Sequence, residues 1–448
     1  MTLPSRLLAA CLVVPLLLGA SVARADSYDN VWMETYYITQ CSFTAANPNV
    51  GNLSTGAAGY GALNDWRIGT SRSADAVDPG TSAIGAIGLL YGYNRLVTAG
   101  RSNPDLDTRA KTALSGYFWS WVRNSQNHVV ETVNGVKRVG FMQSPTGQFV
   151  NYDANGNRTN AFPGGAAATA EVLIAMRKYC LYSPNGDRAN YQSQEYALAQ
   201  QMAQYVDAHL GSWTVDRSYA VAAFRAFSHW ATAVGDAGTA TYYANRANTL
   251  AGWLVAAQDP GAWGNYFAYL DGGGKGVYNG GVDQTGFAPY EFSARDPGEA
   301  YAKKLADWWE TGTAYNNEPL SIASGRYAGG VHQWTPAVGR DTKVYPGSAL
   351  QLADAEWKIA RATGNYHDLY AAAWKHYNFA LSALGAGTGS GCWVNNGSVD
   401  GVVGGFVDWV DTANGARPAA WQRFVDTSAY AIIATEQLAF SSLVDWSH

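Results

Sequence analysis

The pattern of hydrophobic positions predicts six buried helices in this chain. Six times, an Asp or Pro is followed by a run of small and apolar residues, and the run at residues 83–91 is apolar on every face. A helix of that composition must be covered all round, and Asp or Pro is typical of a helix N-terminus. We expect the inner helices to begin near Asp78, Pro163, Asp216, Asp283, Pro346 and Asp426.

Between these runs lie segments with only one apolar stripe. Residues 191–211, for example, carry apolar side chains at helical spacing with glutamines and Asp207 between them. The segments with the same pattern are 28–45, 106–124, 237–257, 297–310 and 366–384. Inner and outer helices therefore alternate, which predicts an all-α fold: an (α/α)6 barrel, or toroid, whose inner helices all begin around one mouth. A generic multi-helix domain or a superhelical array would also give this pattern.

Long loops and small β-hairpin insertions are expected at the mouth. Residues 128–142 predict a hairpin, because Asn134-Gly135 between two Val-rich runs is typical of a type I′ turn. The segments 263–281, 325–345 and 385–426 are predicted loops rich in Gly and aromatic residues. Loops longer than about 15 residues in a compact protein are more often functional than structural.

The N-terminal residues and the charge favour one secreted domain. Residues 1–25 are typical of a signal peptide, with Arg6, an apolar stretch and the cleavage site Ala23-Arg24-Ala25. Residues 26–448 are expected to form a single catalytic toroid, extracellular or, in a bacterium, periplasmic. No later stretch is apolar enough to span a membrane. A formal net charge of -5 without Lys/Arg runs argues against nucleic acid as a partner, and we expect a monomer.

The cysteines and glycines give no sign of a metal or a cofactor. Cys41, Cys180 and Cys392 remain after the predicted cleavage, so at most one internal disulfide can form, and its pairing is open. There is no CxxC and no HExxH motif, and the Gly-rich segment 271–276 lacks the spacing of a phosphate-binding loop. We therefore expect neither metal nor cofactor.

The aromatic content points to a carbohydrate partner. The chain has 17 Trp and 28 Tyr but only 15% charged residues. Sugar rings stack on aromatic faces while polar side chains bind the hydroxyls. Most of these aromatic residues belong in the core, but Trp66, Trp334 and Trp409 lie in predicted loops beside polar groups. We expect these three, together with Arg67, to line a concave surface at the mouth.

These features resemble the six-hairpin glycosidase superfamily, the (α/α)6 toroids. The resemblance covers nearly all of residues 26–448 and lies in architecture and composition, without a family-specific motif. The superfamily includes glucoamylase-like, cellulase-like and unsaturated-glucuronyl hydrolases as well as polysaccharide lyases. The resemblance implies a cleft lined by loops near the N-termini of the inner helices. It also implies that two carboxylic acids act with inversion, as in many of these hydrolases.

Inverting hydrolysis needs one protonated and one ionised carboxyl, roughly 6.5 to 9.5 Å apart with a water between them. In the glucoamylase-like branch the acid follows the fifth helix and the base follows the eleventh. Counted along this chain, that implies Asp216 as acid and Asp408 or Asp411 as base, with Asp78 and Asp283 in reserve. An Asp at a helix start can also serve simply as an N-cap. The other carboxylates expected at the mouth are Asp65, Asp75, Asp153, Glu291, Asp341 and Asp426.

Two other functions fit the same composition. A lyase needs a base for the proton beside a uronate carboxyl and a cation or amide to neutralise that carboxylate. His332, Arg340 and Tyr345 lie within one predicted loop, and several toroid lyases use such a trio. A carbohydrate-binding protein without catalysis would stack sugars on the same aromatic side chains and would not need paired carboxylates.

Overall fold

The computed structural model describes residues 14–42, 61–63, 66–67, 79–128, 130–133, 136–139, 166–211, 214–257, 269–271, 274–276, 283–311, 319–335, 339–365, 367–382, 391–394, 403–418 and 423–448. Within these ranges it describes the backbone alone at residues 14–26, 66–67, 124–128, 130–133, 136–139, 257, 269–271, 274–276, 283–286, 308, 333–335 and 339–340.

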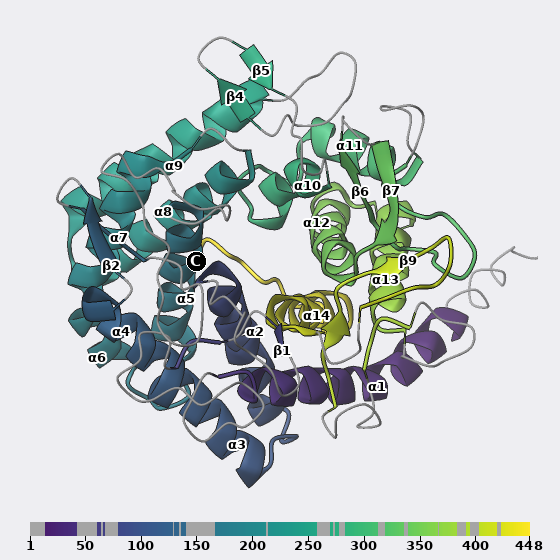
Figure 1. Cartoon of the computed structure of the whole chain (residues 1–448), viewed down its shortest axis with the longest axis horizontal. Coiled ribbons are helices and arrows are strands. Elements are labelled where there is room, and N and C mark those ends of the chain that lie inside the picture. The colour runs from purple at the N-terminus through teal and green to yellow at the C-terminus, as the bar shows by residue number, and fades with distance from the viewer. Residues whose placement is uncertain are drawn as a thin grey trace, which may run out of the picture.

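Six helices of the described part form a closed inner ring (Figure 1). They are α2 (Pro79–Thr98), α5 (Ala166–Tyr182), α8 (Thr214–Val234), α10 (Asp283–Glu291), α12 (Pro346–Thr363) and α14 (Val425–Leu438). Each helix contacts the next, and α14 contacts α2. All six begin within three residues of the predicted positions, so the predicted (α/α)6 barrel is confirmed. Asp78 and Pro163 themselves lie outside the described residues.

A second layer of helices surrounds this ring. Its members are α1 (Val14–Thr39), α3 (Pro104–Lys111), the π-helical turn η1 (Thr112–Phe118), α4 (Trp119–His128), α6 (Arg188–Gln194), α7 (Tyr196–His209), α9 (Ala237–Ala257), α11 (Ala300–Thr311) and α13 (Asp368–Ala380). The predicted outer segments are confirmed, but 191–211 is split at Glu195 and 106–124 contains the π-turn. Helix α1 extends across the predicted cleavage site, which stays a prediction. No helix in the described ranges is long and apolar enough to cross a membrane.

The inner helices approach each other closely because small residues line their contacts. A Cβ atom built on Gly88 of α2 would lie 2.5 Å from the Cα of Ala429 in α14. The backbones at this seam therefore touch with nothing between them. The main hydrophobic cluster runs from Tyr37 to Trp446 and includes all six inner helices. Cys41, Cys180 and Cys392 are buried in it, without a disulfide between them among the described residues.

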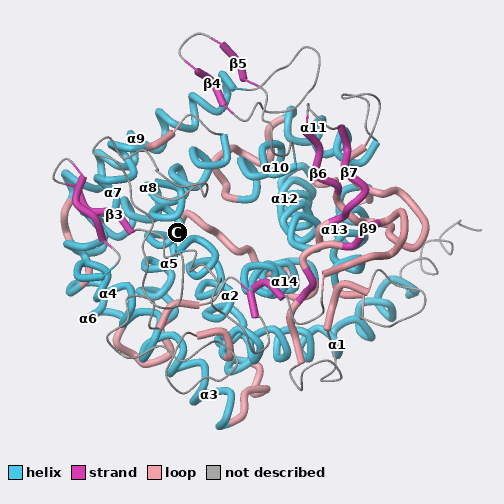
Figure 2. The backbone as a smooth tube through the Cα atoms, viewed as in Figure 1, coloured by secondary structure: helices cyan, strands magenta, loops and turns pink. Residues whose placement is uncertain are grey.

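Short sheets stand where the inner helices begin (Figure 2). One sheet has the order β1 (Trp66–Arg67), β10 (Arg423–Phe424) and β8 (Phe406–Val407). The other has the order β6 (His332–Thr335), β7 (Gly339–Val344) and β9 (Val410–Asp411). Strand β10 leads directly into α14, and β7 leads through Tyr345 into α12. Both sheets therefore lie at the mouth, where the sequence had predicted long loops.

Two hairpins complete the described strands. β2 (Val130–Val133) pairs antiparallel with β3 (Val136–Val139), with Val133 opposite Val136, which confirms the predicted hairpin. β4 (Tyr269–Asp271) pairs with β5 (Gly274–Gly276) inside the predicted loop 263–281.

The segment after α14 closes the other end of the ring. It turns back into the centre of the ring in Figure 1. Trp446 is fully buried there, and its indole Nε1–H donates to Asp354 of α12 at 3.4 Å. Lys178 of α5 donates to the backbone carbonyls of Asp445 and His448. The ring is therefore plugged opposite its mouth, which leaves the mouth as the side for ligand entry.

Candidate functional site

Asp216 lies in the first turn of α8, at the mouth of the ring. Burial raises the pKa of its carboxyl to about 6, although the Arg217 guanidinium acts in the opposite direction. That guanidinium points away: it donates to the carbonyl of Gly211 at 3.0 Å and lies 3.7 Å from the ring centre of Trp253. Asp216 can therefore keep a proton near neutral pH, as a general acid must.

Asp426 occupies the first turn of α14, on the opposite side of the ring (Figure 1). Its Oδ1 accepts hydrogen bonds from the Thr427 backbone N–H at 2.5 Å and from the Thr427 hydroxyl at 3.3 Å. Two donors and a helix N-terminus favour the charged form of a carboxyl. The two aspartates thus differ in environment: Asp216 is suited to hold a proton, and Asp426 accepts two hydrogen bonds at a helix N-terminus.

A layer of polar side chains lies inside the ring below these aspartates. Tyr219 is one turn along α8 from Asp216, and Tyr430 is one turn along α14 from Asp426. Burial raises the pKa of Tyr219 well above its usual value, and the carboxylates of Glu171, Glu291, Asp216 and Asp426 raise it further. Burial also raises the pKa of Tyr430, and Glu291, Tyr219 and Glu171 raise it further. The two tyrosines therefore lie within electrostatic reach of each other and of the carboxylates of Glu171, Glu291 and Asp426, and Tyr219 also of that of Asp216.

A third group of polar side chains lies where the sheet β6–β7–β9 leads into α12. His332 of β6 is 2% exposed, and neither of its ring nitrogens has a hydrogen-bond partner among the described residues. Its Nδ1 lies 3.7 Å from Oδ1 of Asp341 in β7. The Tyr345 hydroxyl donates to the other Asp341 oxygen at 3.1 Å. The predicted pair His332 and Tyr345 is thus linked through Asp341.

Of the predicted base candidates, Asp408 lies in the turn between β8 and β9, and Asp411 is the last residue of β9. Asp408 is half-buried, and burial raises its pKa to about 6, while Lys343 acts in the opposite direction. The Lys343 ammonium also lies 4.0 Å from the ring centre of half-buried Trp409. Asp411 caps its own turn, accepting from the Ala413 N–H at 2.9 Å. Asp411 therefore has a structural role that Asp408 does not share.

Several predicted site residues stay untested. Asp78 lies outside the described residues. For some others the backbone alone is described, and these are Trp66, Arg67, Asp283, Trp334 and Arg340. Trp66 in β1 and Trp334 in β6 stand on the two mouth sheets, so the predicted aromatic cleft stays a prediction.

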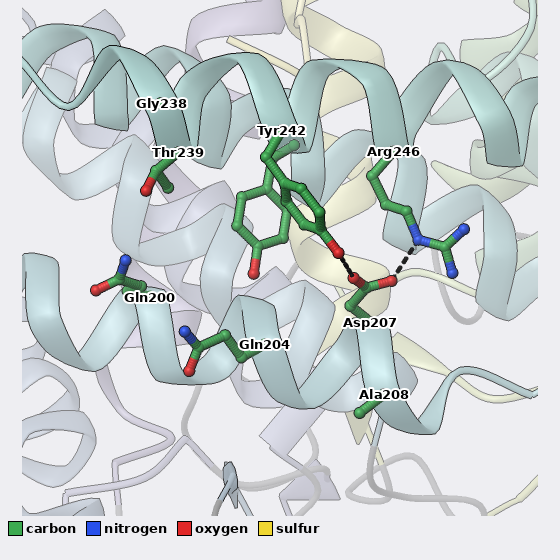
Figure 3. A pocket seen from close by; sticks show the side chains of 9 residues that line it. Gln200, Gln204, Asp207, Ala208, Gly238, Thr239, Tyr242 and Arg246 are labelled. Carbon is green, nitrogen blue, oxygen red and sulfur yellow. Dashed lines mark hydrogen bonds and ion pairs between the residues drawn. The ribbon is translucent and has the colours of Figure 1, made fainter.

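A separate groove of about 780 Å³ lies on the outer wall between α7 and α9 (Figure 3). Gln200, Gln204 and Asp207 line it from α7, and Tyr242 and Arg246 line it from α9. The Tyr242 hydroxyl donates to Asp207 at 2.6 Å, and Arg246 forms an ion pair with the same carboxylate. Because the one carboxylate in the groove is already paired, the groove does not supply two catalytic acids.

The polar layer inside the ring includes residues that sequence reasoning missed or ranked low. Glu171, Tyr219 and Tyr430 were not candidates, and Glu291 was only one of many carboxylates. One signal was available: Glu171 is the only acidic residue in α5, an otherwise largely apolar helix. A lone carboxyl on a helix that is covered all round must face a polar interior or a ligand.

Comparisons with solved structures give the fold. Cellobiose 2-epimerase from Spirochaeta thermophila matches with a TM-score of 0.57 and 11% identity, covering 96% of this chain and 99% of that one. A sugar epimerase from a ruminal bacterium matches with a TM-score of 0.55 and 11% identity, covering 92% and 99%. Glucoamylase from Hypocrea jecorina matches with a TM-score of 0.52 and 14% identity, covering 96% and 73%.

No protein-family model and no curated protein sequence matches the chain. At these identities the likeness is one of fold, and it spans nearly the whole chain. The resemblance inferred from the sequence is thereby confirmed at the level of fold: the chain has the same (α/α)6 toroid fold as these epimerase and glucoamylase structures.

Proposed function

We propose that this protein is a secreted carbohydrate-active enzyme, an inverting glycoside hydrolase that acts on a poly- or oligosaccharide at the mouth of the ring. The observation that carries the proposal is the pair Asp216 and Asp426. They lie in the first turns of opposite inner helices, and the pKa of Tyr219, raised by burial, is raised further by the charges of both. Proteins with this fold include glucoamylases and an endoglucanase, whose names denote hydrolysis of carbohydrates.

In the proposed mechanism Asp216 is the general acid. It donates its proton to the glycosidic oxygen as the bond to the anomeric carbon breaks, so the leaving sugar departs as an alcohol. Asp426 stays ionised and takes a proton from a water on the opposite face of the sugar. That water adds to the anomeric carbon and inverts its configuration. Asp408, one of the two base candidates from the sequence beside Asp411, is the alternative to Asp426.

The test compares three isosteric variants with the parent enzyme. Purified protein is incubated with a panel of polysaccharides, and new reducing ends are measured. We expect Asp216→Asn and Asp426→Asn each to lower kcat by about 100-fold or more, with the thermal unfolding transition retained. Asp408→Asn should lower kcat by less than either.

Asp207→Asn in the outer groove is the matched control, and it should retain activity because this carboxylate lies on the outer wall and is already paired with Tyr242 and Arg246. Equal activity of the parent and Asp216→Asn would contradict the proposal. If Asp408→Asn were inactive and Asp426→Asn active, the base would be Asp408. Proton NMR of the fresh product gives the anomer and tests inversion.

A second candidate function rests on His332. The His332 imidazole is buried, has no hydrogen-bond partner within the described part of the chain and lies near Asp341, so it is suited to remove a proton from carbon. In a polysaccharide lyase, His332 would take the proton beside a uronate carboxyl, and Arg340 would neutralise that carboxylate. A lyase forms unsaturated uronates without taking up water, and these products absorb ultraviolet light. Such absorbance in the parent enzyme, and its loss in His332→Ala, would favour a lyase. A panel that yields neither reducing ends nor absorbance would favour a non-catalytic carbohydrate-binding protein.

A further inference from the structure

Between α12 and the outer layer, three helices each contribute one metal-ligating side chain to a single point. They are Glu310 of α11, Glu356 of α12 and His376 of α13, and one ligand atom from each lies within 4.8 Å of the others. The point lies where two outer helices cross one inner helix. Because positions 310, 356 and 376 are far apart in the chain, no metal motif appears in the sequence, and the expectation of no metal rested on that absence.

The imidazole of His376 is oriented as a metal ligand would be. Its Nδ1 lies 2.5 Å from the carbonyl oxygen of Gly329, an acceptor, so this nitrogen carries the hydrogen. The other nitrogen, Nε2, then faces the carboxylates, 2.7 Å from Oε1 of Glu310 and 3.6 Å from Oε2 of Glu356. Metal-ligating histidines almost always donate their second N–H in this way to a carbonyl or carboxylate.

The environment of Glu356 is a second, independent feature that points to a bound cation. Its side chain is fully buried, and neither carboxyl oxygen accepts a hydrogen bond from an N–H or from a Ser, Thr or Tyr hydroxyl among the described residues. Its polar neighbours are the Glu310 carboxyl and His376. The Lys375 ammonium is bonded to Glu310, so it does not satisfy Glu356. A buried carboxylate without donors is costly, and a cation beside it removes that cost.

We propose that Glu310, Glu356 and His376 form a divalent-cation site, with Zn²⁺ as the ion that fits best. One imidazole nitrogen and two carboxylate oxygens suit zinc, whereas Mg²⁺ and Ca²⁺ prefer oxygen ligands alone. The Glu310 side chain is 15% exposed and that of Lys375 25% exposed, so a fourth, water ligand can reach this side. Bound zinc would clamp α11 and α13 onto α12.

The site does not depend on the proposed hydrolase activity, and its test uses metal binding and thermal stability alone. The full chain is purified, stripped with a chelator and titrated with Zn²⁺ by calorimetry, and zinc is counted by mass spectrometry. We expect one Zn²⁺ per chain and a rise in Tm that the chelator reverses. Glu356→Gln should weaken zinc binding by more than about 100-fold, beyond the usual effect of a residue behind a ligand.

The matched control is His367→Gln, which changes an exposed histidine on the same outer helix pair and should bind zinc like the parent. Failure of the stripped parent protein to take up one equivalent of Zn²⁺ would overturn the proposal, as would equal affinity in Glu356→Gln. Should Glu356→Gln not fold, the Co²⁺ form of the parent decides. Visible absorption bands of four-coordinate Co²⁺ at one equivalent support the site, and their absence refutes it.

Discussion

At the scale of single residues, the proposed acid has a cost in stability. Burial raises the pKa of Asp216 to about 6 in the folded chain, against 3.8 when the group is unperturbed. The folded state therefore binds this proton more tightly than the unfolded state does. The stabilisation is complete below about pH 4 and is lost as the pH rises through about 6.

Asp216→Asn should consequently stabilise the protein at neutral pH. Asn has the shape of the protonated acid and never ionises, so the gain at pH 7 should reach up to about 3 kcal/mol, reduced by the partial exposure of the site. At pH 4 the variant and the parent should be nearly equal. Urea unfolding at the two pH values measures this, and a variant less stable than the parent at pH 7 would disprove it.

The same proton sets the pH dependence of activity. If Asp216 is the general acid, kcat/KM should fall as the pH rises through about 6, because the ionised form cannot protonate the leaving group. The fall should be absent from the residual activity of Asp216→Asn. A profile that rises through this range would assign Asp216 a different role.

At the scale of helices, close packing outweighs helix propensity on the inner ring. Alanine is a better helix former than glycine by about 1 kcal/mol. At Gly88, however, a methyl group would meet the Ala429 backbone at 2.5 Å, and neither helix can move without opening the ring. Gly252 of α9 has no atom within 4 Å of the same methyl position.

Substitution of Gly88 and Gly252 by alanine should have opposite effects on stability. Gly88→Ala should lower the free energy of unfolding by about 1 to 3 kcal/mol, the usual cost of overpacking. Gly252→Ala should raise it by about 0.5 to 1 kcal/mol. Thermal unfolding of the two variants beside the parent measures both signs, and stabilisation by Gly88→Ala would mean that the α2–α14 seam is looser than described.

The helices could be predicted from the sequence because their signals are local. Pro346 at the first position of α12 and the apolar run of α2 can be read without knowing what packs against them. The site could be predicted only in part. Asp216 was a candidate because it marks a helix start, and its role in the site stays a prediction. The grouping of Glu310, Glu356 and His376 depends on how three helices cross, and periodicity along one helix holds no information about that crossing.

At the scale of the whole molecule, the three buried thiols report on the ring as a unit. Cys41, Cys180 and Cys392 come from distant parts of the chain, and burial raises the pKa of Cys180 to about 12. We expect all three to react with a thiol reagent at one common rate, set by global unfolding. One thiol that reacts well before the others would indicate that part of the ring opens by itself.

The closure of α14 on α2 also determines when the protein can finish folding during its synthesis. Arg95 of α2 and Glu436 of α14 pair across this seam, although 341 residues separate them in the chain. At about 5 to 20 residues per second, a ribosome needs about 20 to 70 seconds to translate that distance. During this time the apolar surface of α2 that packs on α14 in the folded protein has no partner on the nascent chain. The newly made protein should therefore depend on chaperones until its last inner helix emerges.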